Sequence, residues 1–390
     1  MSSFESFFPG SAAPRNPYRH GGEYSSPFTS GGNAPRRRVG GPSSRGMSLQ
    51  DRVFIAVGTV FCFMIFMLWK GLPTAPSTAG ASSVAAGVRA GAPRLKGAGA
   101  AERLSAPPTP LPLMTFNLRF AGGNDGLNHW RYRKDHVADI INRYHPIVMG
   151  TQEGLRDQLQ ELHDLLEHPY ERYGIEREIN GEFEQIFYDT TAVEWLDGGN
   201  FWLSETPDTP HTKGWDAACV RLVTWCKFRL LSTRQEFFFV NTQLDHVGET
   251  SRNEGARLLW ARIQEITKAA PEAPLFVVGD FNTYRHTDMY GYLTRATEGP
   301  QFLEAWPQSE KQIGTVSYTY HGWAGVHNDG ERNAKVAANH IDWIFYRPAM
   351  KVLSTEVITE ERNGRYPSDH YPIHSEFLFP SVADLPPPAV

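Results

Sequence analysis

A short apolar run, Leu275-Phe-Val-Val-Gly-Asp-Phe-Asn282, ends with an acid and an amide. Its length and its β-branched and aromatic residues predict a buried strand. Asp280 and Asn282 are two residues apart, so we expect their side chains on the same face of that strand. Polar groups at the end of a buried strand occupy the place where α/β proteins carry their chemistry. The run therefore predicts an α/β fold with a functional site at the strand ends.

Four more segments carry polar residues in similar places. They are residues 111–117 (LPLMTFN), 147–153 (IVMGTQE), 340–345 (HIDWIF) and 366–371 (YPSDHY). The first two are separated by residues 131–144, whose apolar spacing predicts a helix. Taken singly, each polar residue reads as a turn cap or a solvated group. Together they supply oxygen ligands for Mg²⁺ and groups that can handle a phosphoryl group.

In order and spacing, these segments resemble the endonuclease/exonuclease/phosphatase superfamily over residues 111–380. The blocks that carry the resemblance are TFNLR, GTQEG, GDFN, HIDWIF and YPSDH, with FWLSETPDTP, Trp215-Asp216 with Arg221, and SYTYHGW in support. The resemblance implies a four-layer α/β sandwich, in which two packed mixed β-sheets are flanked by helices. It also implies Mg²⁺-dependent hydrolysis of a phosphoester substrate, with Mn²⁺ as a possible substitute.

The same resemblance assigns a metal site. Glu153 matches the principal Mg²⁺ ligand of the family. Asn117 and Asp369 match residues near the metal or the bound phosphate. We therefore expect these three residues to be metal ligands, with Asn117 also contacting phosphate.

Four further residues match the family's catalytic groups. Asp280 matches the group that orients or deprotonates the attacking water, and Asn282 matches the amide that holds a phosphate oxygen. His370 matches the histidine that binds the scissile phosphate, and Asp342 matches the acid that orients this histidine. Phosphoester hydrolysis needs charge neutralisation and an in-line water, which this set would provide.

One position departs from the family pattern. Val240-Asn-Thr-Gln-Leu-Asp-His246 resembles an Asn-Thr-His-Leu-Asp-His stretch, but Gln243 stands in place of the first histidine. We expect Gln243 to bind a phosphate oxygen, although an amide cannot transfer a proton at neutral pH. His246 is three residues further on, and strand alternation predicts that it points to the other face. An active enzyme is therefore expected, with a catalytically silent phospho-ligand-binding protein as one alternative.

The N-terminal part has a different composition. Residues 53–69 contain no charge and would span about 26 Å as a helix. Seven arginines precede this stretch, which predicts a cytosolic N-terminus and a lumenal or extracellular catalytic domain. No Asn-x-Ser/Thr sequon follows it, which argues against that orientation. The predicted organisation is a disordered basic tail (1–52), a transmembrane helix that anchors the chain (53–72), a flexible linker (73–110), the catalytic domain (111–380) and a Pro-rich tail (381–390).

Charge and missing motifs narrow the function. Residues 1–70 hold eight of the 38 basic residues and three of the 43 acidic ones, which leaves 30 basic and 40 acidic residues downstream. Because nucleic-acid affinity comes mainly from Lys and Arg, no stable nucleic-acid complex is expected, and a nuclease is the second alternative. No GxSxG, HExxH or CxxC motif supports a serine hydrolase, a zincin or a cysteine zinc site. Cys219 and Cys226 are expected to be buried free thiols.

Overall fold

The computed structural model describes residues 110–295, 301–314, 318–325 and 340–379. The predicted basic tail (1–52), transmembrane helix (53–72), linker up to residue 109 and Pro-rich tail (381–390) lie outside these residues. Within the described ranges, no helix is both long and apolar enough to cross a membrane. The strands and helices of these described residues run from Pro110 to Leu378.

Seven strands form the larger sheet. Its central strand is antiparallel to one neighbour and parallel to the other, so the sheet is mixed. In sheet order the strands are β10 (Ser309–Ile313), β12 (Lys351–Val357), β13 (Ile373–Leu378), β1 (Pro110–Asn117), β2 (Val148–Gly154), β4 (Phe183–Asp189) and β3 (Tyr170–Tyr173).

Six strands form the second sheet, which is also mixed, because β7 and β8 are parallel and the other pairs are antiparallel. In sheet order they are β5 (Val193–Trp202), β6 (Leu222–Leu230), β7 (Glu236–Gln243), β8 (Leu275–Asp280), β11 (Asp342–Arg347) and β9 (Leu303–Glu304). The strands β7, β8 and β11 are buried on both faces, and each contains a run of apolar residues, as expected for inner layers.

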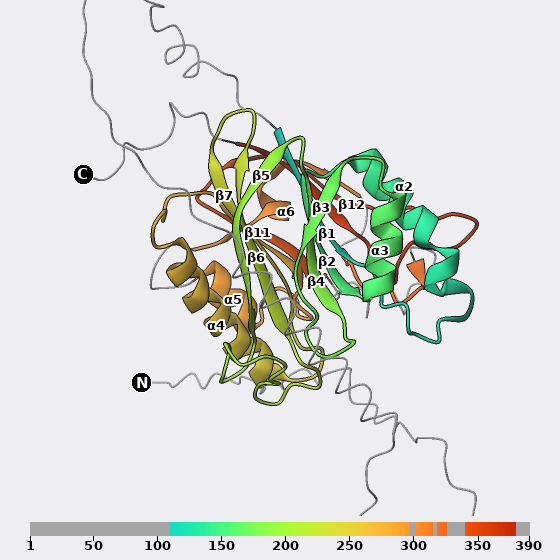
Figure 1. Ribbon diagram of the computed structural model, residues 1–390, viewed down its shortest axis with the longest axis horizontal. Helices are drawn as coiled ribbons and strands as arrows, with labels where there is room; N and C mark the ends of the chain where they lie inside the picture. The colour runs from blue at the N-terminus through green and yellow to red at the C-terminus, as the bar shows by residue number, and fades with distance from the viewer. Residues whose placement is uncertain (1–109, 296–300, 315–317, 326–339, 380–390) are drawn as a thin grey trace, which may run out of the picture. The chain divides into compact units, whose positions relative to one another are not determined.

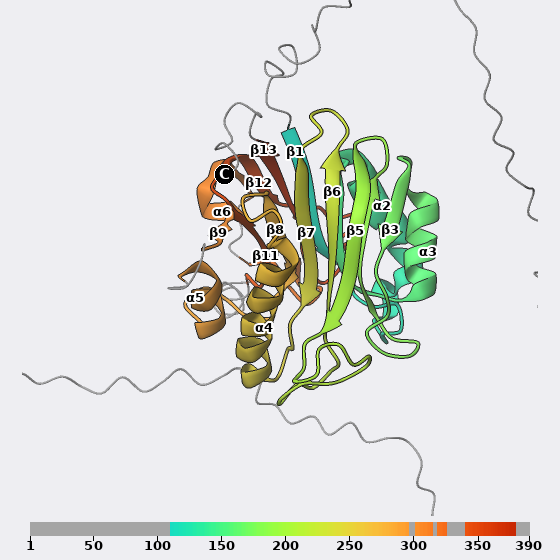
Figure 2. The same ribbon diagram turned by 60° about the vertical axis from the view of Figure 1, so that its left-hand side comes forward.

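The helices cover the outer faces of the two sheets. α2 (Lys134–Tyr144) and α3 (Arg156–Leu165) lie on the seven-stranded sheet, while α4 (Glu249–Thr267) and α5 (Asp288–Thr294) lie on the six-stranded one (Figures 1 and 2). A short helix, α6 (Ala305–Gln308), lies beside β11 and β12. A third apolar cluster, rich in phenylalanine, fills the space between the sheets. The predicted four-layer order of helix, sheet, sheet and helix is therefore confirmed.

A polar contact fixes the two sheets against each other. A Cβ atom on Gly150 would lie 2.6 Å from Oδ1 of Asn241, so only glycine permits this approach of β2 to β7. The Asn241 amide donates to the carbonyls of Thr151 and Gln185 at 2.9 and 3.0 Å, and it accepts from Gln152 at 2.7 Å. Because every polar atom of this buried side chain is bonded, the contact sets the relative position of the sheets.

Three sequence predictions need correction. The helix expected over residues 131–144 begins at Lys134, after a 3₁₀ turn over Trp130–Tyr132. The strand expected over residues 275–282 ends at Asp280. Cys226 is a buried free thiol as expected, but Cys219 is only half-buried, because it precedes β6 rather than lying within it.

Candidate active site

Residues far apart in the sequence meet where strands of both sheets end. Asn117 closes β1, and Glu153 lies near the end of β2. In the other sheet, Gln243 and Asp280 pair across parallel strands, and Asp342 pairs with Asp280 across antiparallel strands. These registers bring the five side chains to one edge of the sandwich.

A β-bulge directs the Glu153 side chain into the site. The β2–β4 register shifts between Thr151 and Gly154, and Glu153 has a left-handed backbone with φ 63°. Its Oε1 accepts from the amides of Asn117 (3.0 Å) and Gln243 (2.9 Å). Burial alone would raise the pKa of Glu153, but these amide bonds and the charge of His370 lower it. Glu153 is therefore held as a carboxylate.

Asn117 presents a donor to the site, not an acceptor. Its Nδ2 donates to Glu153 (3.0 Å) and to Asp280 (3.1 Å), while its Oδ1 accepts from the backbone N–H of Arg119 (2.9 Å). An amide nitrogen is not a metal ligand. In this arrangement the amide nitrogen of Asn117 faces the two carboxylates, and its predicted contacts with a metal and with phosphate stay predictions.

Asp280 accepts hydrogen bonds from three amide side chains. Its Oδ2 receives bonds from Asn117 and Gln243, both at 3.1 Å, and from Asn282 at 3.3 Å. Burial and the nearby Asp342 carboxylate raise the pKa of Asp280 to about 6. A carboxyl group with this pKa is suited to accept a proton near neutral pH.

Asn282 reaches Asp280 by a route different from the predicted one. The strand has already ended, and Asn282 has φ 48°, a conformation that asparagine tolerates better than most residues. Its backbone N–H donates to Asp280 at 2.9 Å, and its amide donates to the Leu244 carbonyl at 3.0 Å. A turn, not strand alternation, therefore puts the two side chains together.

His370 forms an ion pair that joins the two sheets. Its Nδ1 lies 2.9 Å from Oδ2 of Asp342, and both side chains are nearly inaccessible. Burial alone would lower the pKa of His370, but the charge and hydrogen bond of Asp342 override it and raise the pKa to about 10. The Thr319 hydroxyl accepts from the backbone N–H of Asp342 at 3.1 Å, which fixes the acid. His370 is therefore an imidazolium at neutral pH.

Two arginines, not predicted as site residues, hold Gln243. Its Oε1 accepts from Arg221 Nη1 (2.5 Å) and Arg177 Nη1 (3.3 Å), so its Nε2 must face Glu153 and Asp280. Arg221 belongs to a sequence block that resembles the family, and this resemblance is the one feature of the sequence that could have placed it near the site. Arg177 lies in no recognised motif. The two guanidinium groups also place positive charge behind the amide.

His246 lies on the same side as Gln243, contrary to the strand-alternation argument. β7 ends at Gln243, so alternation no longer applies three residues later. The Arg221 Nη2 donates to Nδ1 of His246 at 3.0 Å while Nη1 of the same group holds Gln243. His246 is therefore linked to the site through Arg221.

The donor chemistry fits a divalent cation. Glu153, Asp280, Asp342 and Asp369 converge on a site with His370, and burial raises the pKa of Asp369. Asp369 is 6% exposed, its Oδ1 accepts from Ser368, and its Oδ2 lies 3.9 Å from Arg119. Carboxylate oxygens are the ligands that Mg²⁺ and similar ions take.

One group of side chains at the site is compact enough to hold a metal ion. Asp280, Asp342 and His370 have ligand atoms within 4.8 Å of one another. Glu153 and Asp369, the predicted metal ligands, belong to no such group of three among the described residues, so their role at a metal stays a prediction.

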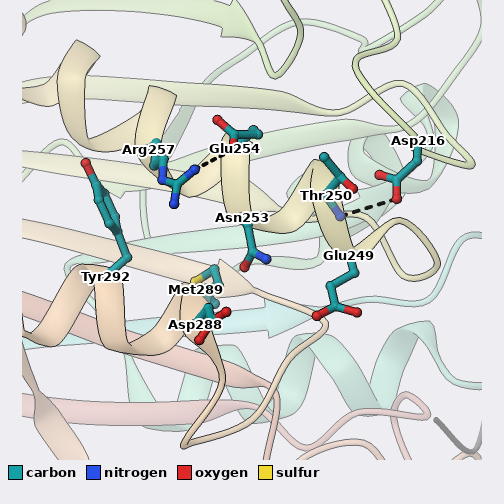
Figure 3. A pocket seen from close by; sticks show the side chains of 9 residues that line it. All are labelled: Asp216, Glu249, Thr250, Asn253, Glu254, Arg257, Asp288, Met289 and Tyr292. Atoms are coloured by element: carbon teal, nitrogen blue, oxygen red, sulfur yellow. Dashed lines mark hydrogen bonds and ion pairs between the residues drawn. The ribbon is translucent and has the colours of Figure 1, made fainter.

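A cavity of about 600 Å³ lies away from this site, at α4 and α5 (Figure 3). It contains none of the predicted site residues. Four acids line it, and its arginine is paired with one of them, Glu254. Because this lining would repel a phosphate, the cavity is unsuited to a phosphoester substrate.

Several proteins of known structure are similar to this chain in sequence and in fold. Residues 114–370 match the Endonuclease/Exonuclease/phosphatase family. A Bacteroides vulgatus endonuclease/exonuclease/phosphatase has 35% identity and a TM-score of 0.62, covering 70% of this chain and 100% of its own. Mannosyl-6-phosphatase Bt3783 from Bacteroides thetaiotaomicron has 29% identity and a TM-score of 0.62, covering 69% and 100%.

A more distant structure shows the fold alone. The D. rerio protein TDP2, complexed with a single strand DNA product, has 20% identity and a TM-score of 0.52, covering 69% of this chain and 99% of its own. No curated protein sequence matches the chain. The family match spans most of the described residues. The chain belongs to the endonuclease/exonuclease/phosphatase family, whose members are phosphoester hydrolases.

Proposed function

We propose that this protein is a Mg²⁺-dependent phosphatase or phosphodiesterase that uses the strand-end site. One observation carries the proposal. A carboxylate held ionised (Glu153), a carboxyl group with a pKa of about 6 (Asp280) and an imidazolium (His370) converge on one site. These are three different protonation states in one place, as acid–base and charge-stabilising catalysis requires.

Asp280 would activate the attacking water. Three amide donors hold its carboxylate, so it cannot rotate away from the site. Above pH 6 it is mostly ionised and can accept a proton from water as the oxygen attacks phosphorus. Asn282 fixes this orientation with both its backbone and its side-chain N–H.

His370 and Gln243 would stabilise the charge that grows on the phosphoryl oxygens. His370 carries its proton because Asp342 is bonded to its other nitrogen. Two arginines occupy the Gln243 oxygen, so its N–H groups face the site, where they donate to Glu153 and Asp280 and would turn to a phosphoryl oxygen. A charged donor already aimed at the reacting group, such as His370, needs no reorganisation during the reaction and contributes most in an enclosed site.

Glu153 and Asp369 would hold the divalent cation, with Mg²⁺ favoured and Mn²⁺ as a substitute. The bound charge would neutralise a non-bridging phosphate oxygen and lower the barrier to attack. We place Asn117 beside the phosphate as a donor rather than at the metal.

For the substrate, we favour a phosphoester of a small molecule, a lipid headgroup or a glycan over nucleic acid. The similarity to a mannosyl-6-phosphatase over that protein's whole length supports a sugar phosphate. The acidic balance of the chain downstream of residue 70 argues against nucleic acid. A nuclease would instead lose activity steeply with salt.

We further propose that residues 53–72 anchor the protein in a membrane. The arginines before this stretch would keep the N-terminus cytosolic, with the catalytic domain in the lumen or outside the cell. The absence of charge over residues 53–69 supports the anchor. Protease protection of a C-terminal tag in sealed microsomes tests the orientation, and cleavage of the tag without detergent would refute it.

The activity can be tested with nitrophenyl phosphate and bis-nitrophenyl phosphate, with and without Mg²⁺. We expect Mg²⁺-dependent hydrolysis by the full chain, and loss in Glu153→Gln, which keeps the size of the side chain but removes its charge. The preferred ester would separate a phosphatase from a phosphodiesterase. Mannose 6-phosphate would then be tested as a natural substrate.

Two results would count against the proposal. If folded protein hydrolyses neither ester but binds phosphate in a metal-dependent way, the silent binding protein is the better account. If Glu153→Gln and His370→Ala both retain full activity, the site is elsewhere in the chain.

A further inference from the structure

Two imidazoles and a carboxylate meet at the end of the larger sheet opposite the phosphoester site. His145 follows α2, His168 lies in the loop between α3 and β3, and Asp189 ends β4. Their side-chain ligand atoms all lie within 4.8 Å of one another. β2 starts beside this cluster and reaches Glu153 only at its other end. The cluster therefore has no part in the chemistry described above.

The three side chains are already arranged around one point. His145 Nε2 lies 2.6 Å from Oδ2 of Asp189. The rings of His145 and His168 stack with centroids 3.4 Å apart and an angle of 6° between their planes. Tyr170 meets the two rings edge-on, at 6.3 and 6.4 Å. The two imidazoles and the carboxylate therefore lie close enough together to approach one metal ion.

The backbone around each histidine is fixed. His145 has φ 43°, a left-handed conformation that costs a residue other than glycine about 1 kcal/mol. Each histidine precedes a proline, and both proline carbonyls accept hydrogen bonds, from Tyr170 Oη (2.6 Å) and Thr190 N (3.1 Å). The left-handed conformation caps the end of α2 and holds His145 beside Asp189.

The carboxylate of Asp189 leaves one oxygen for the cluster. Its Oδ1 accepts from the backbone and hydroxyl of Thr191 at 2.7 and 2.6 Å, whereas Oδ2 contacts only His145 among the described residues. Asp245, in another group with Cys219 and His246, differs. It accepts from Arg221 and from four backbone N–H groups, of residues 218, 219, 247 and 248, so little of it is left for a metal.

We propose that His145, His168 and Asp189 bind a zinc ion. Two imidazole nitrogens and a carboxylate oxygen are a ligand set typical of zinc, and unlike the oxygen ligands that Mg²⁺ prefers. Tetrahedral Zn²⁺ needs ligand atoms about 3.3 Å apart, which side-chain rotations can reach from the present spacing. Binding replaces the hydrogen bond between His145 and Asp189, and any proton on the coordinating nitrogen is released to solvent.

The position of the site gives it a structural role. Zinc there would connect the end of α2, the loop before β3 and the end of β4, in addition to the hydrogen bonds that already join them. It would raise the unfolding temperature of the protein without changing turnover at the other end of β2.

The test uses the full chain, freed of metal and then saturated with Mg²⁺, to which Zn²⁺ is added in a calorimeter. We expect one equivalent of Zn²⁺ to bind in the presence of Mg²⁺. Co²⁺ should give the visible absorption of a tetrahedral site. In His168→Phe, which can keep the stacked ring but lacks the nitrogen, the affinity for Zn²⁺ should fall by more than about ten-fold.

His286→Phe is the control, because it makes the same replacement at an exposed histidine that has no place in the cluster. Its zinc affinity should equal that of the wild type. The proposal is overturned if wild-type protein takes up no Zn²⁺ beside Mg²⁺, or if His168→Phe binds it equally well. If His168→Phe does not fold, His168→Gln serves in the same comparison.

Discussion

Two histidine–aspartate pairs with similar N–O distances lie at opposite ends of the sandwich. His370 and Asp342 are 2.9 Å apart, with side-chain exposures of 6% and 2%. His145 and Asp189 are 2.6 Å apart, with exposures of 39% and 1%. The first pair is enclosed with further carboxylates, which keep its imidazole protonated. The second pair is open and faces another imidazole. The residues around each pair, and not the histidine–aspartate contact itself, therefore determine whether we assign the histidine to charge stabilisation or to metal binding.

The largest expected effect comes from removing each histidine in turn. His370→Ala should lower kcat by about 10³-fold, because the charged donor to the phosphate is lost. His145→Ala should leave kcat unchanged, since this residue is at the far end of the sheet. Both are measured with nitrophenyl phosphate at saturating Mg²⁺. Equal losses in the two variants would contradict the distinction.

A smaller effect is expected from neutralising the acid of the buried pair. Asp342→Asn should lower kcat by about 10²-fold. Because Asp342 raises the pKa of His370 to about 10, wild-type activity should fall only as the pH rises through about 10. In the variant this fall should move to lower pH. If the pH–rate profiles of Asp342→Asn and the wild type lose activity at the same alkaline pH, Asp342 does not set the charge of His370.

Placing a histidine among the carboxylates sharpens the comparison further. Gln243→His gives the site a group that can transfer a proton to the leaving oxygen. We expect the rate with an alkyl phosphate, relative to nitrophenyl phosphate, to rise about ten-fold. Gln243→Leu is the control, and it should slow both esters alike. An unchanged ratio in Gln243→His would mean that the leaving group is not protonated from this side.

The smallest effect concerns the open pair. His145→Asn should change the free energy of unfolding of the metal-free protein by only about 1 kcal/mol, because a partly exposed hydrogen bond contributes little and asparagine tolerates the left-handed backbone. Urea unfolding measures this change. A loss of about 3–5 kcal/mol, as for a broken buried pair, would show that the two environments are less different than we argue.

The sequence predicted the sheets and most of the residues that meet at their edge. Apolar runs mark β1, β2, β8 and β11, because strands buried on both faces must be apolar. Each run has a polar residue at or next to one of its ends, and this residue lies in the site. Family resemblance supplied the grouping of His370 with Asp342, since neither spacing nor composition indicates that residues 28 apart are in contact.

Other features depend on contacts between segments without motifs. The direction of the Asn117 amide follows from Arg119, and that of Gln243 follows from Arg177 and Arg221. The clustering of His145, His168 and Asp189 comes from two loops and a strand end that pack together. Strand alternation also failed at Asn282 and His246, because both lie beyond the last residue of their strands.

The left-handed backbone of Glu153 has a consequence for mutational tolerance. A systematic scan of this position, scored once for protein abundance and once for turnover, should give two different rankings. Glycine and asparagine should lead in abundance, because they relieve about 1 kcal/mol of backbone cost. Glutamate should lead in turnover alone. Selection for solubility or yield would therefore drift away from the functional residue here, and the most stable protein would be an inactive one.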